Sequence, residues 1–570
     1  MRRILAILVV AVGTLGVLPA SPASARGSFT FYGSGSGHGL GMSQWGAYGL
    51  AQDGWAHKRI LSHFYSGTTV KRAASPPNNL RVGLTQGQSA VKLTAQAGRV
   101  RIRIEDPRSG MTVGTIPRGK TWTVRAAGDR YRVLTGAGRR VGGRDWGGTS
   151  RNLYLSYASG ARVRSPDAGA TYNRGFIEFN LSSCGAACSL RMILVIPPEA
   201  YLLGLSEVPS SWPLAALRAQ AVAGRSYAFN KVSAGQHRPG CNCGIYDSSL
   251  DQVYVGWIKE GGTQGARWVR SVRQTANQIV SSGGGAIAAF YTSSSGGHTE
   301  DNENVWGGTP LPYLRGVCDP GDYTNANPSA VWRVSYSAAA VTGRLDGYTG
   351  NIGTVTGFKD FHRGVSGRIV TVRVTGRSGS DVITGAQFRA GLGLKDDRVW
   401  VNRDKNVTGQ IRATYDRENC GPGLPTTPEV DVRGGSRQKF ETGAIFRNAG
   451  DATVWLRGPV YDEYTGVGGA DGELGLPTSK VSPITGVPGC ADGCSRTSFD
   501  DGRIYWKSGA GADALWGRVL NVFQDRNGVD GSLGFPTSRV QEAGDGSTSA
   551  TFEHGSIQCP SPGGGACTVS

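Results

Sequence analysis

One carboxylate within an apolar stretch is the strongest candidate for chemistry in this sequence. Glu207 is the only acid in the segment 201–229, and Leu205, Val208 and Trp212 close to it are apolar. Such surroundings disfavour the charged carboxylate, so they raise its pKa and keep it protonated near neutral pH, as a general acid requires. The alternative is a helix-capping or surface glutamate, which is the commoner role of an isolated acid. The local sequence leaves both interpretations open.

A second candidate cluster follows in the segment 234–257. His237, Cys241 and Cys243 could together bind a zinc ion, because imidazole nitrogen and thiolate sulfur are its usual ligands. A structural zinc site normally has four ligands, with at least two residues between paired cysteines, and Cys-Asn-Cys is tighter than that. Oxidised cysteines are the favoured alternative in an exported protein. We therefore predict no cofactor, with zinc as the less favoured alternative.

The segment that contains Glu207 predicts a turn followed by a helix. Ser211 and Pro213 mark the helix start, because proline fits a first helical position. An apolar stripe with a spacing of about 3.6 residues then follows, formed by Leu214, Leu217, Ala221, Val222 and Tyr227. Glu207 is therefore expected on the turn that leads into a packed helix.

The flanking segments predict strands. Between 80 and 196, and again over 367–376, apolar residues alternate with polar or basic ones, and Gly, Pro, Asn and Asp separate the runs. The 88 glycines also fit a turn-rich β protein. We predict an α+β fold, with a β-rich domain in which a few helices line a cleft. We expect an exposed sheet face lined by arginines, namely Arg101, Arg103, Arg125 and Arg132. The favoured interpretation of this face is solvated structure, and the alternative is contact with a polymer.

The N-terminal leader sequence indicates export, and the net charge indicates the kind of partner. Arg2 and Arg3, an apolar run and a small-residue site at 23–25 predict a signal peptide over 1–25. No later run reaches the roughly 18 apolar residues of a membrane span. The net charge of +19 favours polyanionic partners, and export favours anionic wall polymers over nucleic acid. We predict a secreted or cell-wall-associated protein.

The ten cysteines suggest disulfides in such a compartment. Eight of them fall into local sets, and Cys318 with Cys420 would be a long-range bond by elimination only. The local sets are Cys184 with Cys188, Cys241 with Cys243, Cys490 with Cys494 and Cys559 with Cys567. Their connectivity does not follow from the spacing.

The C-terminal part contains an internal repeat. A Phe-acid-x-Gly-x-Ile pattern begins at Phe440, with Thr442 at its first variable position, and it recurs at Phe499 and Phe552. The segment 472–479 is likewise echoed by 531–538. Self-similarity of this kind indicates small units stacked on one another. We predict a linker over 403–436, rich in Pro, Gly, Thr and Arg, and a small repeat-built domain over 437–570.

Four motifs give the chain a resemblance to a known family. The segment 201–229, GSGSGHGLGMSQWGA at 33–47, DQVYVGW at 251–257 and FYTSSSGGHTEDNENVWGG at 290–308 resemble the SpoIID/LytB family of sporulation protein D and amidase enhancers. The resemblance implies a lytic transglycosylase that cuts peptidoglycan glycan strands with Glu207 as its catalytic acid. It also implies that His38, Ser43, Gln44, Tyr291 and Ser294 hold the glycan, and that Arg225 orients the acid or forms a core salt bridge.

The resemblance also shapes the expected domain plan. In better-known members the glycine-rich motif ends the domain, whereas here it comes first. We therefore predict a domain over 26–402 that is circularly permuted, with residues 29–70 completing it. Ordinary hydrolysis would need a second carboxylate, for which Glu300 or Glu303 is a weak candidate.

The Leu-Gly-Phe-Pro segment resembles the LGFP repeat of actinobacterial wall proteins, which implies tethering to the envelope. Because the family includes amidase enhancers, the rival hypothesis is a non-catalytic wall-binding protein that activates an amidase partner. In that case Glu207 would be dispensable for chemistry.

Overall fold

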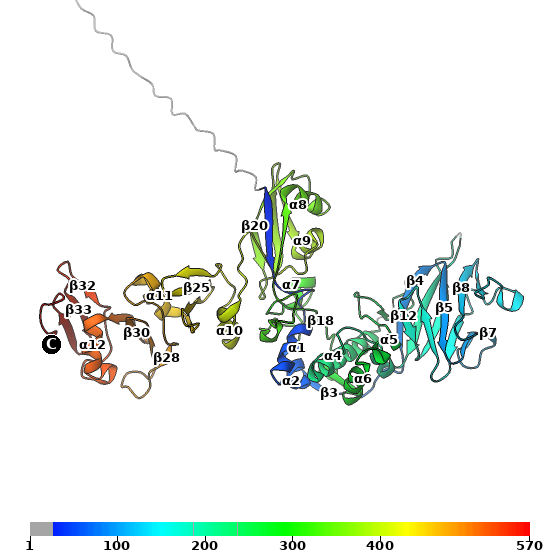
Figure 1. Cartoon of the computed structure of the whole chain (residues 1–570), viewed down its shortest axis with the longest axis horizontal. Coiled ribbons are helices and arrows are strands. Elements are labelled where there is room, and N and C mark those ends of the chain that lie inside the picture. The colour runs from blue at the N-terminus through cyan, green and yellow to red at the C-terminus, as the bar shows by residue number, and fades with distance from the viewer. Residues whose placement is uncertain (1–26, 186, 236–237) are drawn as a thin grey trace, which may run out of the picture.

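The computed structural model describes residues 27–185, 187–235 and 238–570, and it places them in four groups of elements (Figure 1). The predicted signal peptide at 1–25 and His237 lie outside the described residues. The fold is α+β and strand-rich, as predicted. We call the groups the β lobe, the helix lobe, the small lobe and the repeat region.

The β lobe, at the right of Figure 1, is built from the alternating segments of 80–196. Its two antiparallel-rich sheets have the orders β15-β4-β14-β13-β10-β6-β7 and β12-β11-β5-β8-β9, and their inward side chains share one core. The strands of the first are β4 (Leu80–Gln88), β6 (Val100–Ile104), β7 (Thr112–Ile116), β10 (Leu153–Tyr157), β13 (Phe176–Ser182), β14 (Ser189–Ile196) and β15 (Ile245–Tyr246). Those of the second are β5 (Ala90–Ala97), β8 (Thr121–Ala127), β9 (Arg130–Leu134), β11 (Arg162–Ser165) and β12 (Ala170–Tyr172).

The helix lobe is organised around α4 (Leu214–Ser233). The helix begins one residue after the predicted start, because Pro213 is its N-cap, with non-helical backbone, and not its first helical residue. The predicted single apolar stripe understates its burial, because nearly every residue from Ala216 to Phe229 is buried. Four helices surround α4, so even Gln220 and Arg225 face protein. These are α1 (Gln44–Gln52), α2 (His57–Phe64), α3 (Pro198–Leu203) and α6 (Gly265–Gln274); the lobe also holds α5 (Trp257–Gly261), α7 (Asn302–Trp306), β3 (Thr69–Arg72), β16 (Gln278–Ser282) and β17 (Gly285–Ala286).

The N-terminal segment is an integral part of two lobes. β1 (Ser28–Gly33) lies between β19 (Trp332–Ser337) and β23 (Val399–Val401) in the small lobe, and β2 (Met42–Ser43) pairs in parallel with β18 (Tyr291–Thr292) in the helix lobe. Residues 29–70 therefore pair with strands from the C-terminal part of the segment 26–402, which is the arrangement that a permuted domain requires. The permutation itself stays a prediction.

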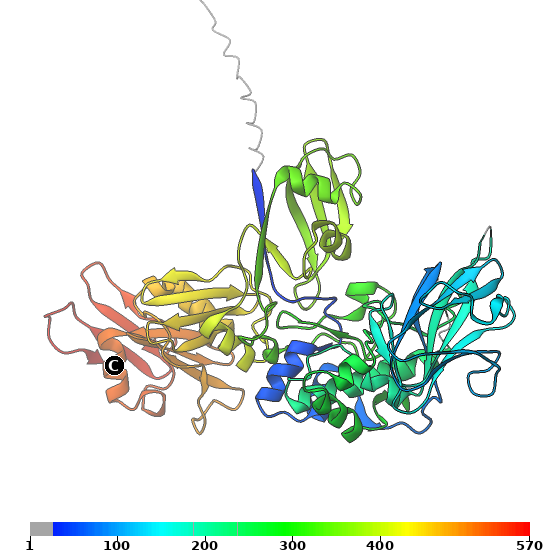
Figure 2. The ribbon, with the colours of Figure 1, turned by 45° about the vertical axis from the view of Figure 1, so that its right-hand side comes forward.

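The small lobe is the upper group in Figure 1, where β1 runs beside β20, α8 and α9. It packs β20 (Val355–Arg363), β21 (Ile369–Gly376) and β22 (Ser380–Thr384) against α8 (Ala338–Leu345) and α9 (Gly385–Leu392). Its apolar core is separate from that of the β lobe. Both lobes flank the helix lobe, as the turned view also shows (Figure 2).

The repeat region contains three antiparallel four-stranded sheets. In each unit a Gly-x-Pro turn bridges to the first repeat phenylalanine, in the pairs Pro425 with Phe440, Pro477 with Phe499 and Pro536 with Phe552. The strands are β24 (Val430–Val432), β25 (Gly435–Phe440), β26 (Gly443–Asn448), β27 (Thr453–Leu456), β28 (Ser482–Pro483), β29 (Cys494–Ser498), β30 (Gly502–Lys507), β31 (Gly511–Trp516), β32 (Gln541–Glu542), β33 (Thr548–Phe552), β34 (Gly555–Cys559) and β35 (Thr568–Val569). Helices α11 (Gly458–Gly466) and α12 (Gly517–Asp525) follow the first two sheets.

The segment 403–436, predicted as a linker, contains α10 (Gly409–Arg417), the first Gly-x-Pro turn and β24. Its Cys420 is bonded to Cys318 of the helix lobe. The other bonds join Cys184 to Cys188, Cys241 to Cys243, Cys490 to Cys494 and Cys559 to Cys567.

Among the helices in the described ranges, none has both the length and the apolar character needed to cross a bilayer.

Candidate active site

Glu207 lies in the wall of a cavity of about 510 Å³ in the helix lobe. The turn between α3 and α4 supplies Glu207, and α1 and β18 supply Gln44 and Tyr291. The glycine-rich loop before α1 contributes His38. This loop passes close to the chain before β18, since a Cβ on Gly41 would lie only 2.1 Å from the Phe290 carbonyl oxygen. Three motifs that are distant in sequence therefore meet at one cavity.

The Glu207 carboxyl accepts a directed hydrogen bond from the backbone. The Val253 N–H donates to Oε1 at 2.7 Å, and the polar groups of Tyr291 and Gln44 lie on the same cavity wall. Burial raises the pKa of Glu207 more than these polar neighbours lower it. A buried carboxyl with a raised pKa is suited to donate a proton near neutral pH.

A chain of amides and phenols fixes the position of Tyr291. Its hydroxyl accepts a bond from Gln252 Nε2 at 3.1 Å, and Gln252 Oε1 accepts one from the Tyr201 hydroxyl at 3.1 Å. The Gln252 amide also donates to the Gly224 carbonyl of α4 at 3.2 Å. Burial raises the pKa of Tyr291 well above its usual value, so this phenol stays a proton donor. The α4 backbone thereby sets the orientation of a group beside the acid.

Aromatic rings form one wall of the cavity. The His38 ring lies 5.0 Å from Trp306, and Phe290 lies 4.6 Å from Trp306, measured between ring centroids. Burial lowers the pKa of His38 to about 3, so this imidazole is neutral. Trp306 is 53% exposed, and Leu250, which also lines the cavity, is 75% exposed. This rim offers an apolar face to a ligand, as sugar-binding clefts commonly do.

The structure separates the predicted glycan-binding residues into two sets. His38, Gln44 and Tyr291 line the cavity with Glu207. Ser43 and Ser294 do not line it, because both are fully buried and donate to the Asp322 carboxylate, at 2.9 and 2.7 Å. These two serines support the loops behind the cavity, and Ser43 also caps α1 by accepting the Gly46 N–H.

Arg225 takes the core role that the sequence left open. Its fully buried guanidinium pairs with Glu199 at 2.6 Å and donates to the carbonyls of Gln278 and Val272. It does not line the cavity. Arg225 therefore ties α4 to α3 and to β16. Within the described part of the chain it makes no hydrogen bond to Glu207.

Neither proposed second carboxylate reaches the cavity. Glu300 is 1% exposed and accepts bonds from the backbone of Val365 and Ser366 in the small lobe. Glu303 is paired with Arg315 at 2.5 Å. The carboxylate that does line the cavity is Asp251, the first residue of the DQVYVGW motif. The position of Asp251 in the DQVYVGW motif is the sequence feature that could have identified it as a site residue.

Asp251 is bound by cations rather than free. Although burial raises its pKa, bonds from Arg238 and the Tyr227 hydroxyl hold that pKa below the usual value. Lys231 lies 3.5 Å from the same carboxylate. The surroundings thus favour the protonated form of Glu207 and the charged form of Asp251.

Two further ionisable groups, just outside the DQVYVGW motif, interact electrostatically with Glu207. Burial lowers the pKa of Lys259 to about 8, and its ammonium donates to the Val208 carbonyl beside Glu207. Burial raises the pKa of Asp247 to about 7, with a further contribution from Glu207. Asp247 accepts the Tyr254 N–H at 2.6 Å. Both groups would change charge close to neutral pH and so alter the field at the acid.

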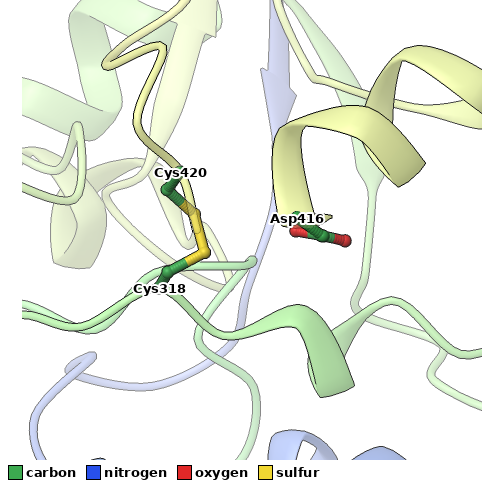
Figure 3. Close-up of side chains that lie close together, drawn as sticks. All are labelled: Cys318, Asp416 and Cys420. Atoms are coloured by element: carbon green, nitrogen blue, oxygen red, sulfur yellow. A yellow bond between two sulfur atoms is a disulfide. The ribbon is translucent and has the colours of Figure 1, made fainter. Parts of the chain in front are cut away.

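The possible zinc ligands do not fit a metal. Cys241 and Cys243 are bonded to each other, so neither offers a thiolate, and both are fully buried. The described residues hold one other set of three potential ligands, Cys318, Asp416 and Cys420, but its two sulfurs form the disulfide drawn in Figure 3. Neither set therefore offers a free thiolate to a metal ion.

Known proteins resemble parts of this chain. The sequence model of the family described as SpoIID, Stage II sporulation protein, matches residues 188–281, and that of the LGFP repeat matches 423–472. The protein named amidase enhancer of Bacillus subtilis (strain 168) is 34% identical over 132 residues, which are 23% of this chain and 16% of that protein. The stage II sporulation protein D of the same organism is 27% identical over 232 residues, which are 38% of this chain and 64% of that protein.

The chain thus spans less than two thirds of either relative. The family match includes Glu207 and the DQVYVGW motif, but the glycine-rich segment at 33–47 and the segment 290–308 lie outside it. Geometry nevertheless places His38, Gln44 and Tyr291 of those two segments at the cavity of Glu207. This chain therefore carries a SpoIID-family domain together with an LGFP repeat.

Proposed function

We propose that this protein is an exported lytic transglycosylase that cleaves peptidoglycan glycan strands, with Glu207 as both acid and base. One observation carries the proposal: the Glu207 carboxyl lies in the cavity wall, its pKa is raised by burial, and the Val253 N–H bonds its Oε1 at 2.7 Å. The five disulfides support an oxidising compartment.

The proposed reaction needs no water and no second carboxylate. Protonated Glu207 gives its proton to the oxygen that bridges C1 of N-acetylmuramic acid to the next sugar, and the C1–O bond breaks. The 6-hydroxyl oxygen of the same muramic acid then bonds to C1, and its proton passes to the Glu207 carboxylate. The products are a 1,6-anhydro end and a free 4-hydroxyl, so Glu207 ends the cycle protonated as it began.

The surrounding residues have distinct proposed roles. The Val253 N–H and the Tyr291 hydroxyl stabilise the carboxylate form between the two proton transfers. His38 and Trp306 provide a neutral apolar wall for a sugar ring. Asp251, held as an ion on the same cavity, favours the positive charge that develops at C1. Ser43, Ser294 and Arg225 keep the supporting elements in place.

The test compares products from purified peptidoglycan, with and without amidase pretreatment, by mass spectrometry. We expect anhydro-muramyl fragments from the mature protein and about a 10²–10⁴-fold lower rate from Glu207→Gln, which keeps the shape but not the transferable proton. Glu105→Gln is the matched control, since it makes the same change at a side chain that is 55% exposed on the β lobe. It should keep the wild-type rate.

A second function remains in competition, favoured by the similarity to the protein named amidase enhancer. If wild type and Glu207→Gln both bind wall but release no fragments from either substrate, the lytic proposal fails. The protein would then be a wall-binding partner of an amidase, and addition of that amidase should give faster stem-peptide release with either variant.

A further inference from the structure

A second cavity, of about 470 Å³, lies on the β lobe and is lined by three arginines. Arg101 and Arg103 come from β6, and Arg108 comes from the loop between β6 and β7. Among the described residues, no acid contributes to its lining. The volume falls in the range of small-ligand sites. We call this site the arginine cavity.

The strand pattern places two of these arginines on one face. In β6 the sequence Val-Arg-Ile-Arg-Ile alternates, and its apolar residues enter the core of the β lobe. Because successive strand residues point to opposite faces, Arg101 and Arg103 share the outer face. The register sets them opposite Ser156 and Tyr154 of β10. The sheet itself therefore brings both guanidinium groups to the cavity.

The charges of these arginines are not neutralised by the protein. Within the described ranges, Arg101 and Arg108 have no ion pair and no side-chain hydrogen bond, and Arg103 donates only to the Gly110 carbonyl, at 2.6 Å. Arg132, by contrast, pairs with Asp145 at 2.6 Å. The arginines predicted on one exposed face therefore lie on two sheets, with Arg101 and Arg103 on β6 of the first and with Arg125 and Arg132 on β8 and β9 of the second. Arg132 is paired, whereas Arg101 is available to a ligand.

The nearest acids are already engaged. Asp106 precedes Arg108 and Pro107, but its carboxylate accepts the backbone N–H groups of Arg108 at 2.8 Å and Ser109 at 2.5 Å. Glu178 lies on the same sheet face and pairs with Arg81 at 2.9 Å. Neither carboxylate therefore neutralises the arginines, so the cavity lining keeps a net positive charge.

Apolar groups complete the cavity. Tyr157 and Phe176 line it, together with Val195 and Pro197. The Tyr157 hydroxyl is used in a bond to the Arg174 carbonyl, so its ring rather than its oxygen faces the site. Arginines beside aromatic and aliphatic surfaces suit an anionic group attached to a sugar or polyol chain.

We propose that the arginine cavity binds the phosphodiester groups of an anionic cell-wall polymer with a sugar or polyol backbone. A phosphodiester offers several acceptor oxygens to converging guanidinium forks. This inference deepens the proposed function by naming where such a polymer binds, and it rests on the exported, wall-directed location in that proposal. It does not depend on Glu207 chemistry.

The experiment measures binding of purified poly(glycerol phosphate) oligomers by calorimetry, with Glu207→Gln as the parent protein so that cleavage cannot intervene. We expect the double substitution Arg101→Gln and Arg108→Gln to weaken binding at least about tenfold, because each lost charge-assisted bond is worth that much. Arg103 is left in place because it holds the loop. The matched control is Arg125→Gln with Arg164→Gln, which removes two exposed arginines of the other sheet.

Each further result decides the question. Retained affinity in the control supports the cavity, whereas equal losses in both double variants would mean diffuse attraction and overturn it. Inorganic phosphate that binds as tightly as the polymer would reduce the site to a small-anion site and overturn the polymer assignment. Tighter binding of a single-stranded oligodeoxynucleotide would overturn the choice of polymer. Cleavage assays with unsubstituted Glu207 test the proposed activity separately.

Discussion

The Glu207 cavity and the repeat region use carboxyl groups in opposite ways, because Glu207 is buried whereas the repeat acids are exposed. At the cavity, Glu207 is kept partly desolvated, with its pKa raised by burial, and nearby Lys259 has its pKa lowered to about 8. In the repeats each acid that follows the repeat phenylalanine closes a turn. Glu441, Asp500 and Glu553 accept the N–H groups of Leu424, Leu476 and Phe535 at 2.9, 2.8 and 2.9 Å.

The two kinds of carboxyl site indicate different roles for the two regions. The repeat device occurs three times, with the same proline bridge and a carboxylate at the same position, and it satisfies one backbone N–H of each turn. The cavity occurs once and keeps ionisable groups under strain from desolvation, which favours chemistry over stability. Substitutions should therefore lose stability in one region and activity in the other.

The largest effect on stability should come from Phe499→Ala in the repeat region. Phe499 is 5% exposed and stacks on Tyr464 with ring centroids 4.9 Å apart. Deleting such a ring should cost about 3–5 kcal/mol of local stability, measured by hydrogen exchange over 443–516. Turnover of a soluble glycan should not change.

Phe290→Ala provides the contrasting substitution. Phe290 is half-buried and lines the cavity against Trp306, so its loss should lower turnover and destabilise less than Phe499→Ala. Equal stability losses with equal turnover in the two variants would remove the distinction between the regions.

A smaller effect is expected from breaking the covalent link between the regions. Cys318 and Cys420 are separated by 102 residues, so their bond restrains a long loop in the unfolded chain. Replacing both by serine should cost about 2–4 kcal/mol of unfolding free energy, measured by urea titration. The Cys490 and Cys494 bond closes a separation of only four residues, so the corresponding double serine variant should lose less. A larger loss in this second variant would contradict the loop-length argument.

The smallest effect should be a gain in stability from Glu207→Gln. Since burial makes the folded-state pKa of Glu207 higher than the unfolded one, the folded protein binds this proton more tightly. That stability is fully present below the unfolded pKa and is lost as pH rises through the folded pKa. Glutamine cannot ionise, so the variant should be about 0.5–2 kcal/mol more stable than wild type at pH 8.

This gain should vanish at acid pH, where Glu207 is protonated in both folded and unfolded protein. Thermal unfolding at pH 4 and pH 8 measures it. A variant less stable than wild type at pH 8 would show that the carboxylate is stabilised by its hydrogen bonds more than it is destabilised by burial. Wild-type turnover should fall as pH rises through the same folded-state pKa, because the acid loses its proton.

The order of residues along the chain was enough to predict the main elements and to make Glu207 a candidate acid. Pro213 predicted the start of α4 because proline fits a helix N-terminus, and alternation predicted the strands of the β lobe because a sheet buries one face. Glu207 was a candidate because its apolar neighbours imply desolvation, and the structure places its carboxyl in a cavity wall with the pKa raised by burial. These inferences use only local order along the chain.

Which distant residues share a site depends on the packing of the folded chain. His38, Gln44, Asp251 and Tyr291 meet Glu207 because β2 pairs with β18 and α1 packs on α4. Ser43, Ser294 and Arg225 stand in the same motifs yet lie behind the cavity wall, because their side chains satisfy Asp322 and Glu199. Residue type fixes what a side chain can bond, but the packing of segments far apart in sequence fixes which partner it meets.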